Sequence, residues 1–169
     1  MNLLDLFSGI GGFSYAARMV GGIMTVGFCE NDLYCQKILS KHWPGVWLHD
    51  DIRTLTGELV ERRVGGVDLI TAGFPCQDIS VAGKRTGIGT REEPTKRSGL
   101  LWELLRVTRE VRPRWLIFEN VPHFIHLGLD GCLDDLEAAG YACWPLIVGA
   151  DDVGAPHRRK RIWIVAHAV

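Results

Sequence analysis

The chain has 169 residues, of which 47% are hydrophobic and 23% charged, with 20 glycines and 7 prolines. This composition is typical of one globular domain over residues 1–169, and it excludes a disordered or fibrous chain. The net charge of −1 lacks the basic excess expected of a self-sufficient nucleic-acid-binding protein, so any such binding must be local.

The cysteines, the histidines and the apolar runs indicate whether the chain has disulfides, a metal site or a membrane segment. The five cysteines are odd in number and form no C-x-x-C pair, which argues against a disulfide framework and a thiolate zinc site. His123 and His126 lack a third ligand at suitable spacing, so no metal site is predicted. No apolar run approaches the ~20 residues that cross a bilayer. We therefore expect a reduced, cytoplasmic protein with no membrane segment.

Strand and helix patterns alternate along the chain. Apolar runs predict strands over residues 2–7, 23–29, 46–48, 67–73, 115–118, 141–148 and 162–165. Helical spacing covers residues 15–20, 32–42, 54–63, 100–111 and 132–139. Alternating βαβ units predict an α/β fold with a doubly wound, mainly parallel sheet. In such sheets, ligands bind beyond the carboxyl ends of the strands.

A glycine turn follows the first predicted strand and precedes a helix. Gly9, Gly11 and Gly12 let the backbone approach a ligand at a helix N-terminus, and Glu30 ends the next strand, where it can accept ribose hydroxyl bonds. Ser14 stands where a dinucleotide fingerprint needs a third glycine. The pattern therefore favours a nucleoside cofactor, with a purely structural tight turn as the alternative.

Two reactive groups follow adjacent strands. Cys76 comes after Pro75 at the start of a long basic loop, residues 74–98, and Glu119 ends the strand that follows it in the sheet. We interpret them as a nucleophile and an acid that meet over neighbouring strand ends. The alternatives are an inert buried thiol and a helix-capping or ribose-binding carboxylate.

Arg159 and Arg161 alternate in the approach to the last predicted strand, so both point to one face. Two guanidinium groups on one face suit an anion or a polarised carbonyl. The alternative is a charged edge strand, since charge commonly protects such edges.

Four motifs in this order strongly resemble the DNA (cytosine-5) methyltransferases: residues 5–13 (DLFSGIGGF), 73–80 (GFPCQDIS), 119–121 (ENV) and 158–161 (RRKR). Each motif alone is modest, but their order and spacing are specific and cover essentially all of the chain. The resemblance implies the Rossmann-like fold of S-adenosylmethionine-dependent methyltransferases. It also implies a restriction-modification enzyme of bacterial or phage origin.

The resemblance assigns a cofactor and its site. It implies S-adenosylmethionine, with Phe7 packing on the adenine side, Glu30 on the ribose and Leu100 closing the pocket. The cofactor-binding residues that it implies are Phe7, Ser8, Gly9, Gly11, Gly12, Glu30, Asn31, Asp51, Ile52, Gly73 and Leu100.

The resemblance also implies the chemistry. Cys76 attacks carbon 6 of a cytosine flipped out of double-stranded DNA, Glu119 protonates or hydrogen-bonds ring nitrogen 3, and Arg159 and Arg161 steady the base carbonyl and the thiolate side. The loop over residues 78–97 is expected to close over the base.

Three positions depart from the family pattern: Ile79 replaces a usual phenylalanine, His157 a glutamine, and Asn31 an aromatic residue after the ribose-binding acid. The likeness covers the catalytic half only, so we expect a C-terminally truncated fold without the target-recognition region and C-terminal segment. A second chain is expected to supply these parts. The alternative is a non-catalytic remnant that binds S-adenosylmethionine or a partner.

Overall fold

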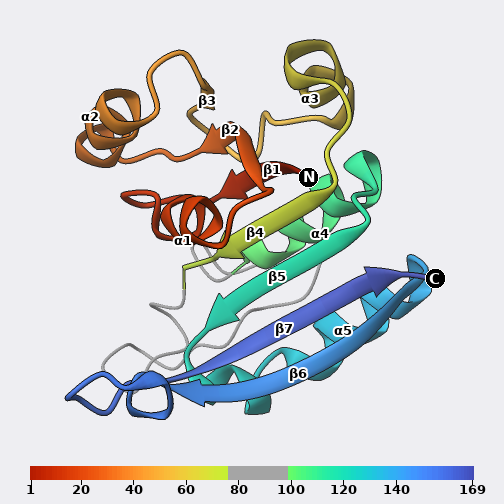
Figure 1. Ribbon diagram of the computed structural model, residues 1–169. Coiled ribbons are helices and arrows are strands. Elements are labelled where there is room, and N and C mark those ends of the chain that lie inside the picture. The colour runs from red at the N-terminus through yellow and green to blue at the C-terminus, as the bar shows by residue number, and fades with distance from the viewer. Residues whose placement is uncertain (76–98) are drawn as a thin grey trace.

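The structure is a computed structural model that describes residues 1–75 and 99–169 (Figure 1). Its described strands form one seven-stranded sheet in the order β3-β2-β1-β4-β5-β7-β6. Their bounds are β1 Asn2–Leu6, β2 Met24–Cys29, β3 Trp47–His49, β4 Leu69–Gly73, β5 Trp115–Asn120, β6 Tyr141–Gly149 and β7 Lys160–Ala168.

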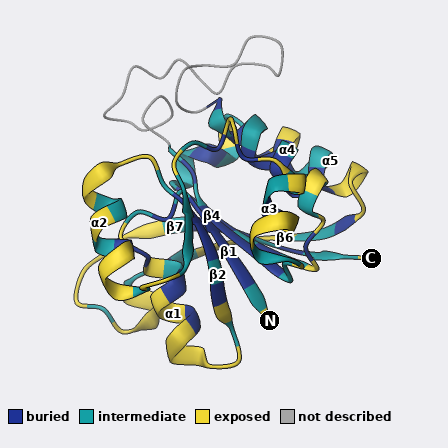
Figure 2. Cartoon of the chain, turned by 90° about the horizontal axis from the view of Figure 1, so that it is seen from above, coloured by how far each residue is buried: buried dark blue, intermediate teal, exposed yellow. Residues whose placement is uncertain are grey.

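Helices cover both faces of the sheet. Helices α1 and α2 lie on one side, and α3, α4 and α5 on the other (Figure 2). Their bounds are α1 Gly12–Val20, α2 Leu33–His42, α3 Gly57–Val64, α4 Leu100–Val111 and α5 Leu129–Ala138, with short 3₁₀ helices η1 Pro122–His126 and η2 Asp151–Val153. The predicted α/β, doubly wound architecture is confirmed, whereas the two 3₁₀ helices were not predicted.

Strands β1 to β5 are mutually parallel, so their carboxyl ends meet at one edge of the sheet. Strand β7 runs antiparallel between β5 and β6, which places its first residues beside the end of β5. Glu119 pairs with Trp163, and Asn120 with Ile162. The start of β7 thereby joins the ligand-binding edge predicted from the parallel strands.

The hydrophobic core is unequal on the two faces. The large cluster lies on the side of α3, α4 and α5, whereas the cluster under α1 contains only Leu3, Ala17 and Leu69 as buried members. Among the described helices, none lies over β5, β7 and β6 on the α1 side (Figure 1). The side chains on this surface, which we call the open face, are Trp115 and Ile117 of β5, Trp163 and Val165 of β7, and Trp144 and Leu146 of β6.

Within the described residues, no helix has the length and apolarity needed to cross a membrane.

Candidate functional site

The glycine turn connects β1 to α1 through left-handed backbone. Phe7, Gly9 and Gly11 have φ values of 51°, 54° and 88°. The amide of Gly11 donates to the carbonyl of Ser8 at 2.8 Å. A Cβ atom on Gly11 would lie 2.6 Å from the ring of Trp43, so this position requires glycine for both conformation and space.

Glu30 holds the turn from the end of β2. One carboxylate oxygen accepts from the Gly9 amide at 2.7 Å, and the other accepts from the Asp32 amide at 2.9 Å. Ser8 adds a second attachment, because its hydroxyl donates to the Asp5 carbonyl at 2.5 Å and its amide to the Cys29 carbonyl at 3.3 Å. The turn is therefore fixed to both neighbouring strands.

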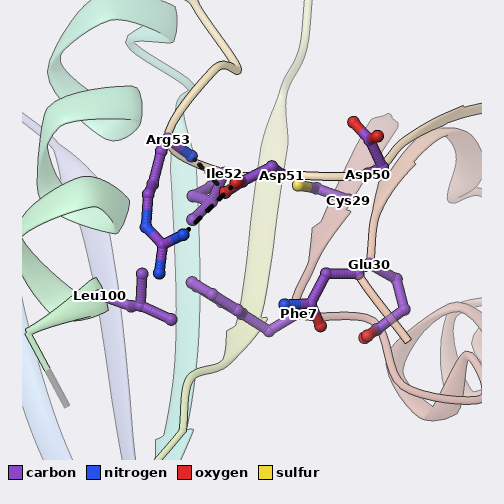
Figure 3. A pocket seen from close by; sticks show the side chains of 9 residues that line it. Phe7, Cys29, Glu30, Asp50, Asp51, Ile52, Arg53 and Leu100 are labelled. Carbon is purple, nitrogen blue, oxygen red and sulfur yellow. Dashed lines mark hydrogen bonds and ion pairs between the residues drawn. The ribbon is translucent and has the colours of Figure 1, made fainter. Parts of the chain in front are cut away.

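A first pocket lies at the carboxyl ends of β1, β2 and β3. It is lined by Phe7, Cys29, Glu30, Asn31, Asp50, Asp51, Ile52, Arg53 and Leu100 (Figure 3). Six of the residues predicted to bind the cofactor are thus brought together: Phe7, Glu30, Asn31, Asp51, Ile52 and Leu100. The sequence interpretation did not include Cys29, Asp50 or Arg53.

The donor set of this pocket suits a nucleoside. Phe7, Ile52 and Leu100 offer apolar surfaces for a planar base. The carboxylates of Glu30 and Asp51 accept from hydroxyl or amino groups, and each Glu30 oxygen keeps a second lone pair beside its amide bond. The enclosed space is only about 30 Å³. Arg53 extends toward Leu100 with a 3.5 Å ion pair to Asp51, and its exposed side chain must move to admit a nucleoside (Figure 3).

Arg106 of α4 holds the segment that carries the pocket residue Ile52. This role was not predicted from the sequence. Its guanidinium donates to the carbonyls of Ile52 and Leu55, both at 2.9 Å. It also pairs with Glu103 at 2.8 Å and Glu110 at 2.9 Å on its own helix. The five N–H groups of arginine make such a fork possible, and nothing in local sequence spacing reveals it.

A second pocket, of about 280 Å³, lies at the ends of β4 and β5 and the start of β7. Its lining residues are Gly73, Phe74, Pro75, Glu119, Asn120, Val121, Arg159 and Arg161. Three of the four predicted catalytic residues, Glu119, Arg159 and Arg161, therefore surround one space. Of the predicted cofactor-binding residues, Gly73 lies here rather than in the first pocket.

Glu119 and Arg161 form an ion pair, with Nε to Oε1 at 2.7 Å and both side chains 24% exposed. Burial raises the pKa of Glu119 above its ordinary value, while the positive charges of Arg161 and Arg159 oppose that rise. The net direction is upward. A carboxyl group with a raised pKa retains a proton nearer to neutral pH, as a general acid requires.

Asn120 joins the ends of the two strands beneath this pocket. Its buried side chain donates to the Phe74 carbonyl at 3.3 Å and accepts from the Val121 amide at 2.8 Å. The backbone that leads into Pro75 is thereby attached to the end of β5.

A wide apolar groove of about 710 Å³ adjoins the second pocket, and Glu119, Arg159 and Arg161 line both. The groove runs between α1 and the open face, where Phe13 packs edge-on against Trp163 with ring centroids 5.8 Å apart. The predicted residue Gly12 lies on its wall.

Cys76 and the loop over residues 78–97 lie outside the described residues. The other four cysteines are free thiols whose pKa values are all raised, chiefly by burial, to about 12 for Cys29 and about 11 for Cys143. Thiolates are the reactive form of cysteine, so none of these four is set up as a nucleophile.

The sheet order, with β7 antiparallel between β5 and β6, defines an α/β protein with the fold of the S-adenosylmethionine-dependent methyltransferases. The comparison with known families agrees, because the model of the C-5 cytosine-specific DNA methylase family matches residues 1–169. The chain belongs to this family.

Individual curated proteins and solved structures are also similar to this chain. Type II methyltransferase M2.BsuMI of Bacillus subtilis is 36% identical over 172 residues, covering 98% of this chain and 42% of that protein. Type II methyltransferase M.CviJI of Paramecium bursaria Chlorella virus IL3A is 34% identical over 96% of this chain and 42% of that protein. The S. pombe Dnmt2 methyltransferase superposes with a TM-score of 0.81 at 25% identity, over 99% of this chain and 51% of that one. The chain spans less than half the length of these two curated relatives.

Proposed function

We propose that this chain carries the catalytic half of a DNA (cytosine-5) methyltransferase, which moves a methyl group from S-adenosylmethionine to carbon 5 of cytosine in double-stranded DNA. The observation that carries the proposal is the pocket at the ends of β4 and β5. There a partly buried acid, Glu119, lies beside Arg161, and the lining residue Pro75 leads directly into Cys76.

The first pocket is the proposed cofactor site. Phe7, Ile52 and Leu100 pack on the adenine, Asp51 accepts from its amino group, and Glu30 accepts from the ribose hydroxyls. Asn31 lines the same space, and the turn of Ser8, Gly9, Gly11 and Gly12, with Gly73 beyond it, borders the rest of the ligand. When bound, S-adenosylmethionine supplies an electrophilic methyl group.

The second pocket is the proposed base site. Carbon 5 of cytosine is a poor nucleophile until a thiolate adds to carbon 6. In our proposal, the Cys76 sulfur forms that bond, the displaced electron pair moves into the ring, and Glu119 donates a proton to nitrogen 3. Arg159 and Arg161 bind the base carbonyl and stabilise the thiolate side. After carbon 5 has accepted the methyl group, loss of the carbon 5 proton and elimination of the Cys76 thiolate restore the aromatic ring, and nitrogen 3 returns its proton to Glu119.

Proton donation by Glu119 is consistent with its environment. Its raised pKa assists proton donation, and Arg161 stabilises the carboxylate that forms when the proton leaves. Because carbon 6 is hidden in a duplex, the target base must leave the stack to reach this pocket.

Target recognition is proposed to come from a segment beyond the matched region of the relatives, carried on the same polypeptide or on a second chain. The relatives are more than twice as long as the stretch that they share with this chain. The open face and its groove offer an apolar surface that leads to Glu119, Arg159 and Arg161, where such a segment can pack beside the base site.

Trapping on 5-fluorocytosine DNA tests the proposal, because fluorine at carbon 5 cannot leave as a proton and the adduct persists. With S-adenosylmethionine and a target-recognition fragment from a relative, we expect a covalent adduct for the wild-type chain and for Cys35→Ser, but none for Cys76→Ser. An adduct that survives Cys76→Ser overturns the nucleophile.

Calorimetry tests the cofactor separately. We expect S-adenosylhomocysteine to bind more tightly than NAD, and Glu30→Ala to weaken it at least tenfold. Cofactor binding without any adduct would instead identify a non-catalytic S-adenosylmethionine-binding protein.

A further inference from the structure

Asp5 is a fully buried acid that the proposed reaction does not use. It lies within β1 at 0% exposure, beneath the glycine turn. One carboxylate oxygen accepts from the Ser14 hydroxyl at 2.8 Å, and the other accepts from the Thr71 hydroxyl at 2.9 Å. Both hydroxyl residues are also buried. A buried carboxylate is costly unless it is well hydrogen-bonded, and here two buried donors are provided for it.

The three residues come from three elements around the proposed cofactor site. Asp5 stands two positions before Phe7, Ser14 lies in the first turn of α1 directly after the glycine turn, and Thr71 is the partner of Asp5 on β4. The carboxylate thus links the start of α1 to the two central strands.

Helix α1 buries few of its own side chains. Of its nine residues, only Ser14 and Ala17 are buried. The N-cap residue before the helix is Gly11, which provides no side-chain cap. Packing and capping ordinarily fix the start of a helix, so the buried bond from Ser14 to Asp5 acts there together with the contacts of Gly11 with Trp43 and of Phe13 with Trp163.

We propose that Asp5 is a positioning residue for the cofactor site: through Ser14 and Thr71 it fixes the first turn of α1 against the sheet and so sets the shape of the glycine turn. This rests on the proposed function, in which that turn borders S-adenosylmethionine.

The charge state of Asp5 gives the proposal a distinctive signature. The pKa of Asp5 is raised to about 7: burial is the main cause, the hydrogen bonds from Ser14 and Thr71 oppose the rise, and the negative charge of Glu30 adds to it. No other charged group acts on it in the described structure to a comparable degree. The ionised carboxylate of Asp5 accepts both hydroxyl hydrogen bonds and its charge strengthens them. In the protonated form one oxygen carries a proton and acts as a donor, so both bonds are no longer accepted by a charged group. The turn is therefore held more firmly above pH 7 than below it.

Hydrogen exchange tests the positioning without any ligand. In Ser14→Ala and Asp5→Leu, we expect the amides of residues 9–13 to exchange at least tenfold faster than in the wild type. The matched control is Ala17→Gly, which weakens α1 as a helix but leaves the carboxylate and its partners intact. It should not accelerate residues 9–13 selectively. Unchanged exchange in both test variants overturns the proposal.

Calorimetry with S-adenosylhomocysteine supplies the functional readout. The wild-type dissociation constant should fall several-fold from pH 6 to pH 8. Asp5→Asn, which can still accept one hydroxyl bond and donate to the other hydroxyl, should bind with no such pH dependence. Asp5→Leu should bind at least tenfold more weakly at pH 8 while remaining folded by circular dichroism.

The two readouts separate two kinds of failure. If the wild type does not bind S-adenosylhomocysteine, the proposed cofactor fails, and hydrogen exchange alone decides the role of Asp5. If the wild type binds but Asp5→Leu binds equally well, Asp5 has a merely structural role and the positioning proposal is overturned.

Discussion

At the residue scale, two opposing influences act on the pKa of Glu119. Burial favours its neutral form, and Arg161, in contact at 2.7 Å, favours its charge. In the proposed reaction, the raised pKa assists donation to a weakly basic ring nitrogen, and the neighbouring guanidinium stabilises the carboxylate that donation leaves. Because the ion pair is partly exposed, we expect it to affect the pKa of Glu119 more than the stability of the fold.

Replacing Arg161 should shift that balance in a measurable direction. In Arg161→Met the pKa of Glu119 should rise, because the largest influence that lowers it is gone. The methylation rate of an enzyme that needs protonated Glu119 falls as pH rises through this pKa. The alkaline limb of the pH–rate profile should therefore move to higher pH, together with a lower maximal rate from the loss of a base contact.

Arg158→Met is the matched control, because Arg158 is exposed and lines neither pocket on the described residues. Its profile should coincide with that of the wild type. An alkaline limb that stays in place in Arg161→Met would mean that Glu119 does not set it.

Sequence reasoning predicted the residues of this pocket better than their contacts. Glu119, Arg159 and Arg161 were predicted from strand ends and alternation, and they line one space. The direct contact of Arg161 with Glu119 depends on β7 entering antiparallel beside β5, and a sequence pattern does not specify strand order or register. Asn120 was visible in its motif, but its bond to Phe74 depends on the same pairing of strand ends.

At the scale of elements, the glycine turn depends on a helix far away in the chain. Gly11 lies against Trp43, which follows the last residue of α2, with no room for a side chain between them. The first turn of α1 and the end of α2 are thus packed on each other through a glycine. This close approach, rather than ligand binding alone, explains the requirement for glycine at this position.

Gly11→Ala should destabilise the protein by about 2–4 kcal/mol, because it combines left-handed strain of about 1–2 kcal/mol with a steric clash in packed structure. Gly154→Ala is the control: its φ of 88° and left-handed conformation match those of Gly11, but no atom lies within 4 Å of the added carbon. It should cost only the strain. Urea denaturation measures both, and equal costs would show that contact with Trp43 is unimportant.

Arg106 connects another pair of elements, α4 and the segment after β3. In Arg106→Lys one ammonium cannot replace bonds to Ile52, Leu55 and two glutamates, so we expect a loss of about 1–2 kcal/mol in stability. Because Ile52 lines the proposed cofactor pocket, affinity for S-adenosylhomocysteine should also fall about tenfold.

Arg109→Lys is the matched control on the same helix, where the arginine pairs with Asp135 of α5, away from the pocket. It should leave cofactor affinity unchanged even if it lowers stability. Equal effects of the two substitutions on affinity would show that Arg106 acts only through the general stability of α4.

The helices and strands were predicted from their alternating periodicity. The bounds and contacts that differ from the prediction are those that capping, strand pairing or tertiary packing determines. The helix expected over residues 54–63 begins at Gly57, because the Thr56 hydroxyl caps it. The last strand extends beyond the predicted residues 162–165 to Lys160–Ala168, since the residues at both of its ends continue the pairing with β6. The anchoring contacts of Arg106 and Asp5 were not predicted, because Ile52 and Leu55 lie 54 and 51 residues from Arg106, and Thr71 lies 66 residues from Asp5.

At the scale of the whole molecule, helices α3, α4 and α5 lie on one side of the sheet, whereas no described helix lies over β5, β7 and β6 on the other side (Figure 1). Trp144 and Leu146 are 51% and 49% exposed on the open face, beside Trp163 and Val165. Contiguous apolar surface of this kind promotes association, with another segment or with another copy. Strand β6 also lies at the sheet edge, where pairing with a second chain is possible.

Charge placed on the open face should therefore suppress association of the 169-residue chain. In the double variant Trp144→Lys with Leu146→Lys, we expect sedimentation to show less self-association at tens of micromolar protein and a weaker fluorescence response of an apolar dye. Folding should persist, because both side chains are half exposed and lysine is tolerated on edge strands.

Ile147→Lys is the matched control, since Ile147 has similar exposure, 52%, on the same strand but points to the opposite side of the sheet. If the control reduces association as much as the double variant, the effect comes from charge on β6 in general; if neither does, the open face is not the surface through which the chain associates.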